Sequence, residues 1–133
     1  MTTPTLAGTW HNQHGSVLHV VDDGGRLMGT FRPGVGPTKG ETFPIVGFAT
    51  SWCFAFVVAF GADGAITSWV GHVLKDEKGF ELDTLWTMAV DVRDAHAPAE
   101  SWKGTWSGAD RFRAGEPALA VRPTALPSAP VAR

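Results

Sequence analysis

The chain contains a single cysteine, Cys53, and no tyrosine among its 133 residues. One cysteine excludes an internal disulfide and a zinc site built from several cysteines. No apolar run approaches the roughly 20 residues that a membrane-spanning helix needs, so we expect no membrane partner. Basic residues form no patch or stripe, and nucleic acid is therefore not an expected partner either.

Charged residues are also scarce, at 18% of the chain with a formal net charge of -2, whereas about 25% is typical. Hydrophobic residues make up 44%. A chain of this length corresponds to one domain, which buries roughly two thirds of its unfolded surface. Residues 1–7 lack the charged and apolar regions of a secretory signal and are expected to form a flexible N-terminus.

Helical periodicity is nearly absent, and short alternating apolar runs take its place. Turn clusters such as Asp22-Asp23-Gly24-Gly25 separate these runs at fairly even spacing, as in sandwiches and barrels. Eight such strands can close into an all-β, antiparallel up-and-down barrel, wide enough for one small ligand. The expected strands span residues 8–13, 16–21, 26–32, 42–49, 52–60, 65–74, 80–91 and 102–112.

The fifth expected strand is apolar on both of its faces, from Trp52 to Phe60. A barrel strand that is apolar outside as well as inside is usually covered on its outer face. We therefore predict a subunit interface over the fifth and sixth strands that extends to the seventh. Cys53 faces outward there with no histidine expected nearby, so we interpret it as a packing residue rather than a nucleophile.

The last expected strand carries one carboxylate, Asp110, on the same face as Gly108 and Phe112. This parity predicts that Asp110 points into the barrel. Trp106 shares the parity and is predicted to lie at the barrel floor. If the first and last strands meet, Asn12, Ser16 and Asp110 converge at one mouth.

The segment after Phe112 differs in composition from the rest of the chain. Residues 113–133 are rich in alanine and proline and show no strand alternation, so we expect an extended tail. We hypothesise that this tail enters the open barrel of a neighbouring subunit when ligand is absent.

Four blocks of sequence resemble the avidin and streptavidin family of biotin-binding proteins. They are Gly8-Thr9-Trp10-His11-Asn12-Gln13-His14-Gly15-Ser16, then Gly29-Thr30-Phe31, then Thr67-Ser68-Trp69-Val70-Gly71 with Thr84-Leu85-Trp86, and last Trp102-Lys103 with Gly108-Ala109-Asp110-Arg111-Phe112. Their order and spacing match the family from Gly8 to Phe112. The resemblance implies the barrel domain at residues 8–112.

The resemblance also implies roles in a biotin site. Asn12 and Ser16 would donate hydrogen bonds to the ureido oxygen, and Asp110 would accept one from a ureido N–H. Thr67 would contact the thioether sulfur, and Trp102 would cover the site of a neighbouring subunit. The remaining lining would come from Phe31, Pro33, Val35, Gly36, Phe60, Trp69, Trp86 and Met88.

Four positions depart from the family pattern. Phe31 stands where a tyrosine hydroxyl would complete the ureido-oxygen pocket, and Pro33 stands where a serine or threonine would accept the second ureido N–H. His14 replaces a leucine, and Ala65 replaces a serine that helps to hold the carboxylate. We therefore expect weaker biotin binding than streptavidin shows. His14 at the mouth also suggests a weak pH dependence.

These features favour a non-catalytic protein that binds biotin and needs no cofactor. The alternative is a lipocalin-like carrier of another small apolar ligand. An enzyme is disfavoured because the residues offer no convincing catalytic triad, carboxylate pair or metal set. Trp102 favours a homotetramer, with a homodimer as the other possibility. The resemblance implies secretion or a periplasmic location, although the chain carries no signal of its own.

Overall fold

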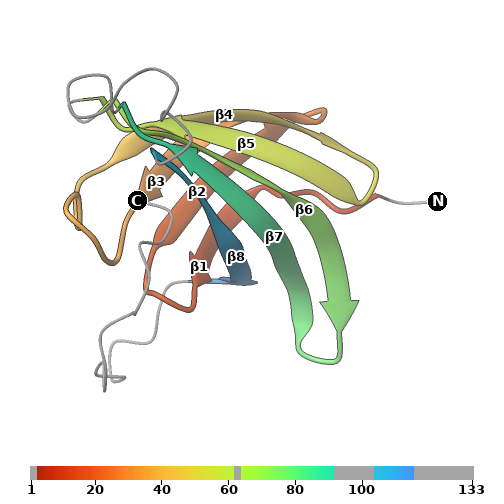
Figure 1. Ribbon diagram of the computed structural model, residues 1–133. Coiled ribbons are helices and arrows are strands. Elements are labelled where there is room, and N and C mark those ends of the chain that lie inside the picture. The colour runs from red at the N-terminus through yellow and green to blue at the C-terminus, as the bar shows by residue number, and fades with distance from the viewer. Residues whose placement is uncertain (1–2, 62–63, 92–103, 116–133) are drawn as a thin grey trace.

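The computed structural model describes residues 3–61, 64–91 and 104–115. Within these ranges eight strands form a closed antiparallel barrel in which each strand pairs with its neighbours in the chain and β8 returns to β1 (Figure 1). The strands are β1 (Gly8–Asn12), β2 (Val17–Asp23), β3 (Arg26–Arg32), β4 (Phe43–Thr50), β5 (Cys53–Ala59), β6 (Ile66–Asp76), β7 (Gly79–Ala89) and β8 (Thr105–Ala114).

This topology confirms the predicted fold class. Because neighbouring strands run antiparallel, the β1–β2, β3–β4 and β5–β6 connections lie at one end of the barrel, called the mouth below. The hairpins at residues 24–25, 51–52 and 77–78 lie at the other end. None of the described residues belongs to a helix long and apolar enough to cross a membrane.

The predicted alternation gives the observed core. Thr67, Trp69, Gly71 and Val73 of β6 are buried, while the residues that alternate with them are more exposed. Leu82, Thr84, Trp86 and Met88 of β7 are buried in the same way, as the period of 2 predicts. Aromatic rings pack together in the interior, with Phe56 stacked on Trp69 at 4.8 Å between ring centroids and Phe31 at 5.0 Å from the same indole.

The sequence prediction for the last strand was wrong about the position of Trp106 and about where the strand ends. The register in which β8 pairs with its neighbours shows both differences. Trp106 pairs with Met88 at the end of β7 that leads to the mouth, not to the floor, and 42% of its surface is exposed. β8 also extends two residues beyond the predicted end, to Ala114. Together with Phe112, this extension pairs with β1, through Trp10 opposite Ala114 and Asn12 opposite Phe112, and it closes the barrel.

The β5–β6 register shows that the expectation of no histidine near Cys53 was wrong. His72 of β6 lies directly opposite Cys53, and both side chains are exposed on the outer face. Among the described residues, no group of three His, Cys, Asp or Glu side chains is arranged to hold a metal ion.

Candidate ligand-binding site

The turn between β1 and β2 is built around the Asn12 side chain. Its Oδ1 accepts hydrogen bonds from the backbone N–H of His14 at 3.0 Å and of Ser16 at 2.9 Å. Gly15 makes the turn possible because it adopts a φ of 79°, which residues with a Cβ rarely adopt. These bonds fix Asn12 so that its amide Nδ2 points away from the turn. That nitrogen is buried and has no hydrogen-bond partner.

Ser16 connects this turn to the start of the β3–β4 loop. The Gly34 N–H donates to Ser16 Oγ at 3.0 Å. Gly34 also lies against the backbone of His14 and Gly15 so closely that any Cβ would collide with it. Pro33, which precedes Gly34, is buried beside the turn. The loop therefore places a residue without a polar side chain next to the Ser16 hydroxyl.

Asp110 is the carboxylate at the centre of the site, and it is 0% exposed. Trp69 donates from its indole Nε1 to Oδ2 at 3.0 Å, and Gln13 donates from Nε2 to Oδ1 at 3.1 Å. Thr84 donates its hydroxyl to the Asp110 carbonyl at 2.9 Å. Trp69 of β6 and Gln13 of the β1–β2 turn thus fix the carboxylate, while Thr84 of β7 holds the backbone of Asp110.

Burial raises the pKa of the Asp110 carboxyl, because a charged group is less stable away from water. The Trp69 hydrogen bond, the charge of nearby His14 and the Gln13 bond oppose this rise of the pKa. Asn12 also lies near enough to lower this pKa slightly, although its Nδ2 makes no complete hydrogen bond within the described protein. Asn12, Ser16 and Asp110 therefore come together as the sequence predicted.

The aromatic lining lies next to this polar group. Phe31, Phe60, Trp69, Trp86 and Met88 are all buried. The Trp86 ring lies over Gly108, where an added Cβ would come within 2.6 Å of the indole Cζ2. Two further buried donors lack partners, Thr67 Oγ1 on β6 and Trp86 Nε1 on β7.

Two of the predicted lining residues are less enclosed. Val35 is half-buried and Gly36 is exposed, and both lie in the β3–β4 loop. The predicted lid residue, Trp102, lies outside the described residues.

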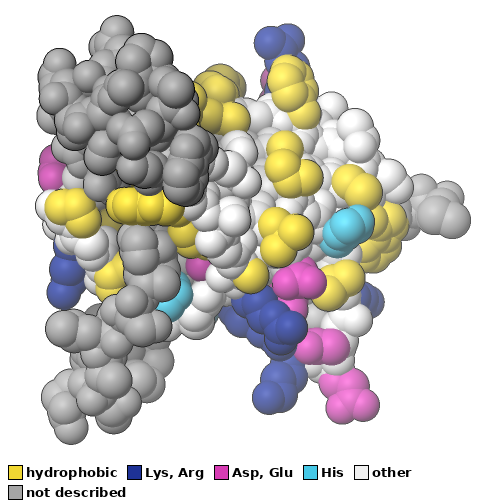
Figure 2. Space-filling model, in the orientation of Figure 1, with side chains coloured by type: hydrophobic (Ala, Val, Ile, Leu, Met, Phe, Trp, Pro, Cys, Tyr) yellow, Lys and Arg dark blue, Asp and Glu magenta, His cyan; other side chains and the backbone are white. Residues whose placement is uncertain are grey.

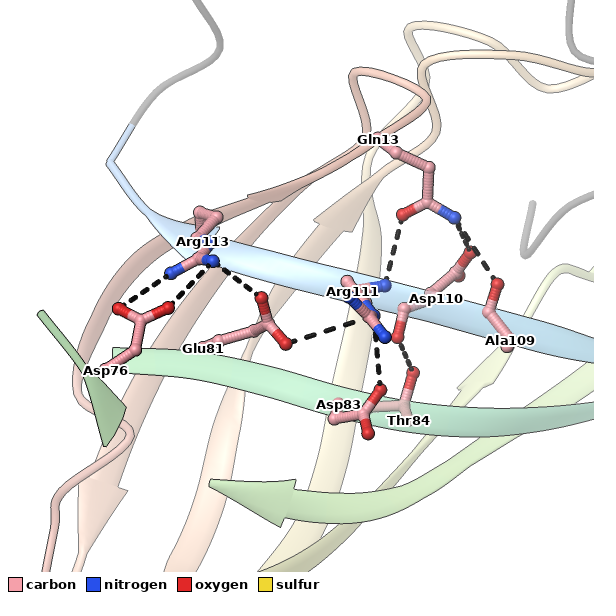
Figure 3. A network of polar contacts seen from close by, with 9 residues as sticks. All are labelled: Gln13, Asp76, Glu81, Asp83, Thr84, Ala109, Asp110, Arg111 and Arg113. Atoms are coloured by element: carbon pink, nitrogen blue, oxygen red, sulfur yellow. Dashed lines mark hydrogen bonds and ion pairs between the residues drawn. The ribbon is translucent and has the colours of Figure 1, made fainter. Parts of the chain in front are cut away.

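Sequence reasoning missed three residues of the site. Gln13 reaches from the β1–β2 turn to Asp110 and also accepts from the Arg111 N–H at 3.1 Å (Figure 3). Thr38 of the β3–β4 loop is buried with an unpaired hydroxyl. Phe43 packs edge-on against Phe60 at 4.7 Å. Gln13 and Asp110 are 97 residues apart, and only the pairing of β1 with β8 brings them together.

A separate hollow of 350 Å³ lies at the opposite end of the barrel. It is lined by Asp22, Gly25, Ala49 and Ser51 and by the segment Thr3–Thr5. Asp22 holds that segment through the Leu6 N–H at 2.9 Å and the Thr5 hydroxyl at 3.2 Å. This hollow contains none of the predicted site residues.

Comparison with known proteins identifies the family to which this barrel and its site belong. The model of the avidin family matches residues 1–115. Xenavidin is 29% identical with a TM-score of 0.71, and the match covers 84% of this chain and 98% of xenavidin. A search of curated proteins gave no significant match.

Two more distant structures share the fold. One is described as a rhizavidin–biotin complex, with 20% identity, a TM-score of 0.70 and coverage of 82% of this chain and 99% of rhizavidin. The other, AVR2, has 23% identity, a TM-score of 0.73 and coverage of 88% and 100%. The closed barrel, the site on β8 and the match over residues 1–115 lead to one conclusion: the chain belongs to the avidin family, a non-catalytic binding family.

Proposed function

We propose that the protein binds biotin inside the barrel, with the fused ring between the aromatic side chains and the ureido group at the mouth-side polar cluster. The observation that carries the proposal is the buried, unpaired Nδ2 of Asn12 beside Asp110. A buried donor without a partner costs stability unless a ligand pairs with it. A cyclic urea supplies an acceptor oxygen for this donor and an N–H for the carboxylate.

The polar groups have complementary roles in this proposal. Asn12 Nδ2 and the Ser16 hydroxyl donate to the ureido oxygen, because the acceptors of both side chains are already engaged by backbone N–H groups. Asp110 accepts from one ureido N–H through a charge-assisted bond. Thr67 Oγ1 is available to the thioether sulfur.

The affinity is proposed to be lower than that of streptavidin, whose biotin complex is among the tightest known. Phe31 and Pro33 are both buried, and neither carries a hydroxyl. Each neutral hydrogen bond contributes about 0.5–1.5 kcal/mol net, so the absence of two weakens binding by roughly 5- to 150-fold.

Isothermal titration calorimetry of the full chain with biotin tests the proposal. We expect saturable binding with one biotin per chain and an affinity at least about fivefold below that of streptavidin measured alongside. An affinity equal to that of streptavidin would refute the weakening by Phe31 and Pro33. No detectable heat, together with no retention on biotin-agarose, would refute biotin as the ligand and leave a carrier of another small apolar ligand.

We further propose that the protein is a homo-oligomer that assembles through the outer face of the barrel. Laterally paired residues form an apolar row across four strands: Phe48 on β4, Ala55 on β5, Val70 on β6 and Leu85 on β7. Phe48 is 66% exposed and Leu85 is 71% exposed. Figure 2 shows hydrophobic side chains gathered over β5–β7. A contiguous exposed apolar patch is typical of an interface.

Light scattering after size-exclusion chromatography tests the assembly. Leu85→Asp is expected to lower the measured mass to that of a smaller species, because it introduces a charge at the β7 end of the row, at its most exposed residue. Thr87→Asp, on the same strand face but outside the row, is the matched control. A wild-type chain that is already monomeric at all concentrations would contradict the proposal. A tetramer would agree with a lid from a neighbouring subunit, the role proposed for Trp102.

A further inference from the structure

The polar atoms around the mouth-side cluster are mostly hydrogen-bond donors. Asn12 offers its unpaired Nδ2, since its Oδ1 already accepts two backbone N–H groups. Ser16 Oγ accepts from Gly34, which leaves the hydroxyl hydrogen free to donate. A ligand therefore has to present an acceptor oxygen to this pair of donors.

Asp110 is the principal acceptor at the same place. Its two carboxylate oxygens each accept one bond, from Trp69 and from Gln13. An ionised carboxylate has about four acceptor positions, so further capacity remains for a ligand N–H. Because Asp110 is fully buried, a hydrogen bond from one ligand N–H to its carboxylate contributes strongly to the binding free energy.

On the β3 side of the cluster, neither Phe31 nor Pro33 carries a side-chain acceptor, and the unpaired hydroxyl of the described β3–β4 loop belongs to Thr38, five residues after Pro33. Pro33 is buried, carries no polar side-chain atom and has its carbonyl engaged by the Gly40 N–H at 2.9 Å. Phe31 is buried against Trp69. The unpaired Thr67 hydroxyl lies on β6, four strands around the barrel from Ser16 at the start of β2.

We propose that the site is matched to a small ring with one carbonyl-type oxygen and a single N–H, a lactam, and binds it at least as well as the cyclic urea of biotin. The inference rests on the proposed function. The first N–H of a urea reaches Asp110, but the second is buried against Pro33 and Phe31 and loses its bond to water. An unpaired buried N–H lowers affinity by roughly tenfold, whereas a methylene group in the same place has no bond to lose.

Calorimetry with three compounds tests this proposal: biotin and the two lactam analogues in which one or the other ureido N–H is replaced by CH₂. One lactam keeps the N–H that faces Asp110 and is expected to bind as tightly as biotin or up to about tenfold more tightly. The other lacks that N–H and is expected to bind at least about tenfold more weakly than biotin. If both lactams bind more than about threefold more weakly than biotin, the proposal is overturned.

Pro33→Ser provides a second test, because it places an acceptor hydroxyl on the empty side. Biotin is expected to gain about tenfold relative to the better lactam in this variant. Pro33→Ala makes the same change to the backbone without the hydroxyl and should leave the ratio unchanged. An equal ratio in both variants would contradict the assigned role of Pro33. If none of the three compounds binds the wild-type chain, the proposed function fails as well, whereas binding of biotin alone refutes only the lactam preference.

Discussion

The two faces of β8 carry opposite kinds of polar chemistry. On the outer face, Arg113 contacts Glu81 at 2.9 Å and Asp76 at 3.1 Å, and Arg111 lies 3.7 Å from Asp83 (Figure 3). On the inner face, Asp110 is held by neutral donors alone, and Asn12 beside it retains an unpaired donor. The outer network is complete without a ligand. The inner cluster retains a buried donor without a partner. The outer face of the strand therefore stabilises the fold, whereas its inner face is suited to binding a ligand.

The difference extends to the pKa values. The hydrogen bond from Arg113 holds the pKa of the Asp76 carboxyl below its usual value, so this group favours its charged form. Burial has the reverse effect on Asp110 and raises its pKa. Ionising a carboxyl whose pKa is raised by burial weakens the ligand-free fold, which is expected of a site that is stabilised by its ligand.

The largest expected effect comes from removing the inner carboxylate. Asp110→Ala should lower biotin affinity by about 100-fold or more, because it removes a charge-assisted bond and leaves the Trp69 N–H without its partner. Asp110→Asn is the matched variant: it should also bind weakly, yet unfold at the same or a higher urea concentration than wild type. Calorimetry and urea unfolding check both. A large loss of stability in Asp110→Asn would show that the inner cluster is structural too.

A smaller loss of affinity is expected from Gly108→Ala. The added methyl group would meet the Trp86 indole, so the ring must move by an amount that costs about 1–3 kcal/mol. We expect biotin affinity to fall about tenfold and the tryptophan fluorescence spectrum to shift. Ala109→Ser, one residue along and on the exposed face, is the control. Unchanged affinity in Gly108→Ala would place Trp86 outside the binding site.

A pH titration tests the role of Asp110 through the direction in which biotin affinity changes with pH. Because the folded pKa of Asp110 is raised, its contribution to ligand-free stability is greatest at low pH and is lost as the pH rises through that pKa. Biotin needs the ionised form, so affinity should rise over the same interval, by up to about tenfold per pH unit below the pKa. Calorimetry from about pH 4 to about pH 8 measures this rise.

Asp110→Asn should remove that dependence, whereas His14→Leu should keep its sign and alter only its midpoint, since His14 is the nearby titratable neighbour. An affinity that falls as the pH rises would contradict the acceptor role of Asp110.

The smallest effect on binding is expected from the outer network. Arg113→Ala should lower the midpoint of urea unfolding, because it leaves Glu81, whose side chain is only 11% exposed, without its closest partner. The loss should shrink in high salt, since the pair with Asp76 is partly exposed. Biotin affinity should stay within about twofold of wild type. A loss of affinity comparable to that of Asp110→Ala would end the distinction between the two faces.

Much of this comparison could be predicted from the sequence, and the reason is the period of 2. Alternation along residues 102–112 placed Asp110 inside, and the resemblance implied Trp86 and Met88 as lining. The structure has all three buried, Trp86 and Met88 on the alternating inner face of β7. Register could not be predicted in the same way. It sets Trp106 at the exposed end of β8, brings His72 opposite Cys53 and pairs Arg113 with Glu81. These outcomes depend on how far one strand slides along another, which no single segment encodes.

Gln13 illustrates the same limit at the site itself. Nothing in the sequence around it distinguishes it from an ordinary turn residue, and its bonds to Asp110 and Arg111 exist only because β8 closes onto β1. Resemblance to the family supplied roles for Asn12, Ser16 and Asp110. The structure shows which of their hydrogen-bonding atoms are already paired and which donors remain unpaired.

A crystal structure of the biotin complex tests the central claim most directly. The account predicts a ureido oxygen within hydrogen-bonding distance of Asn12 Nδ2 and Ser16 Oγ, one ureido N–H on Asp110, and no protein acceptor for the other N–H beside Pro33. A ureido group bound away from Asp110, or biotin bound outside the barrel, would contradict it.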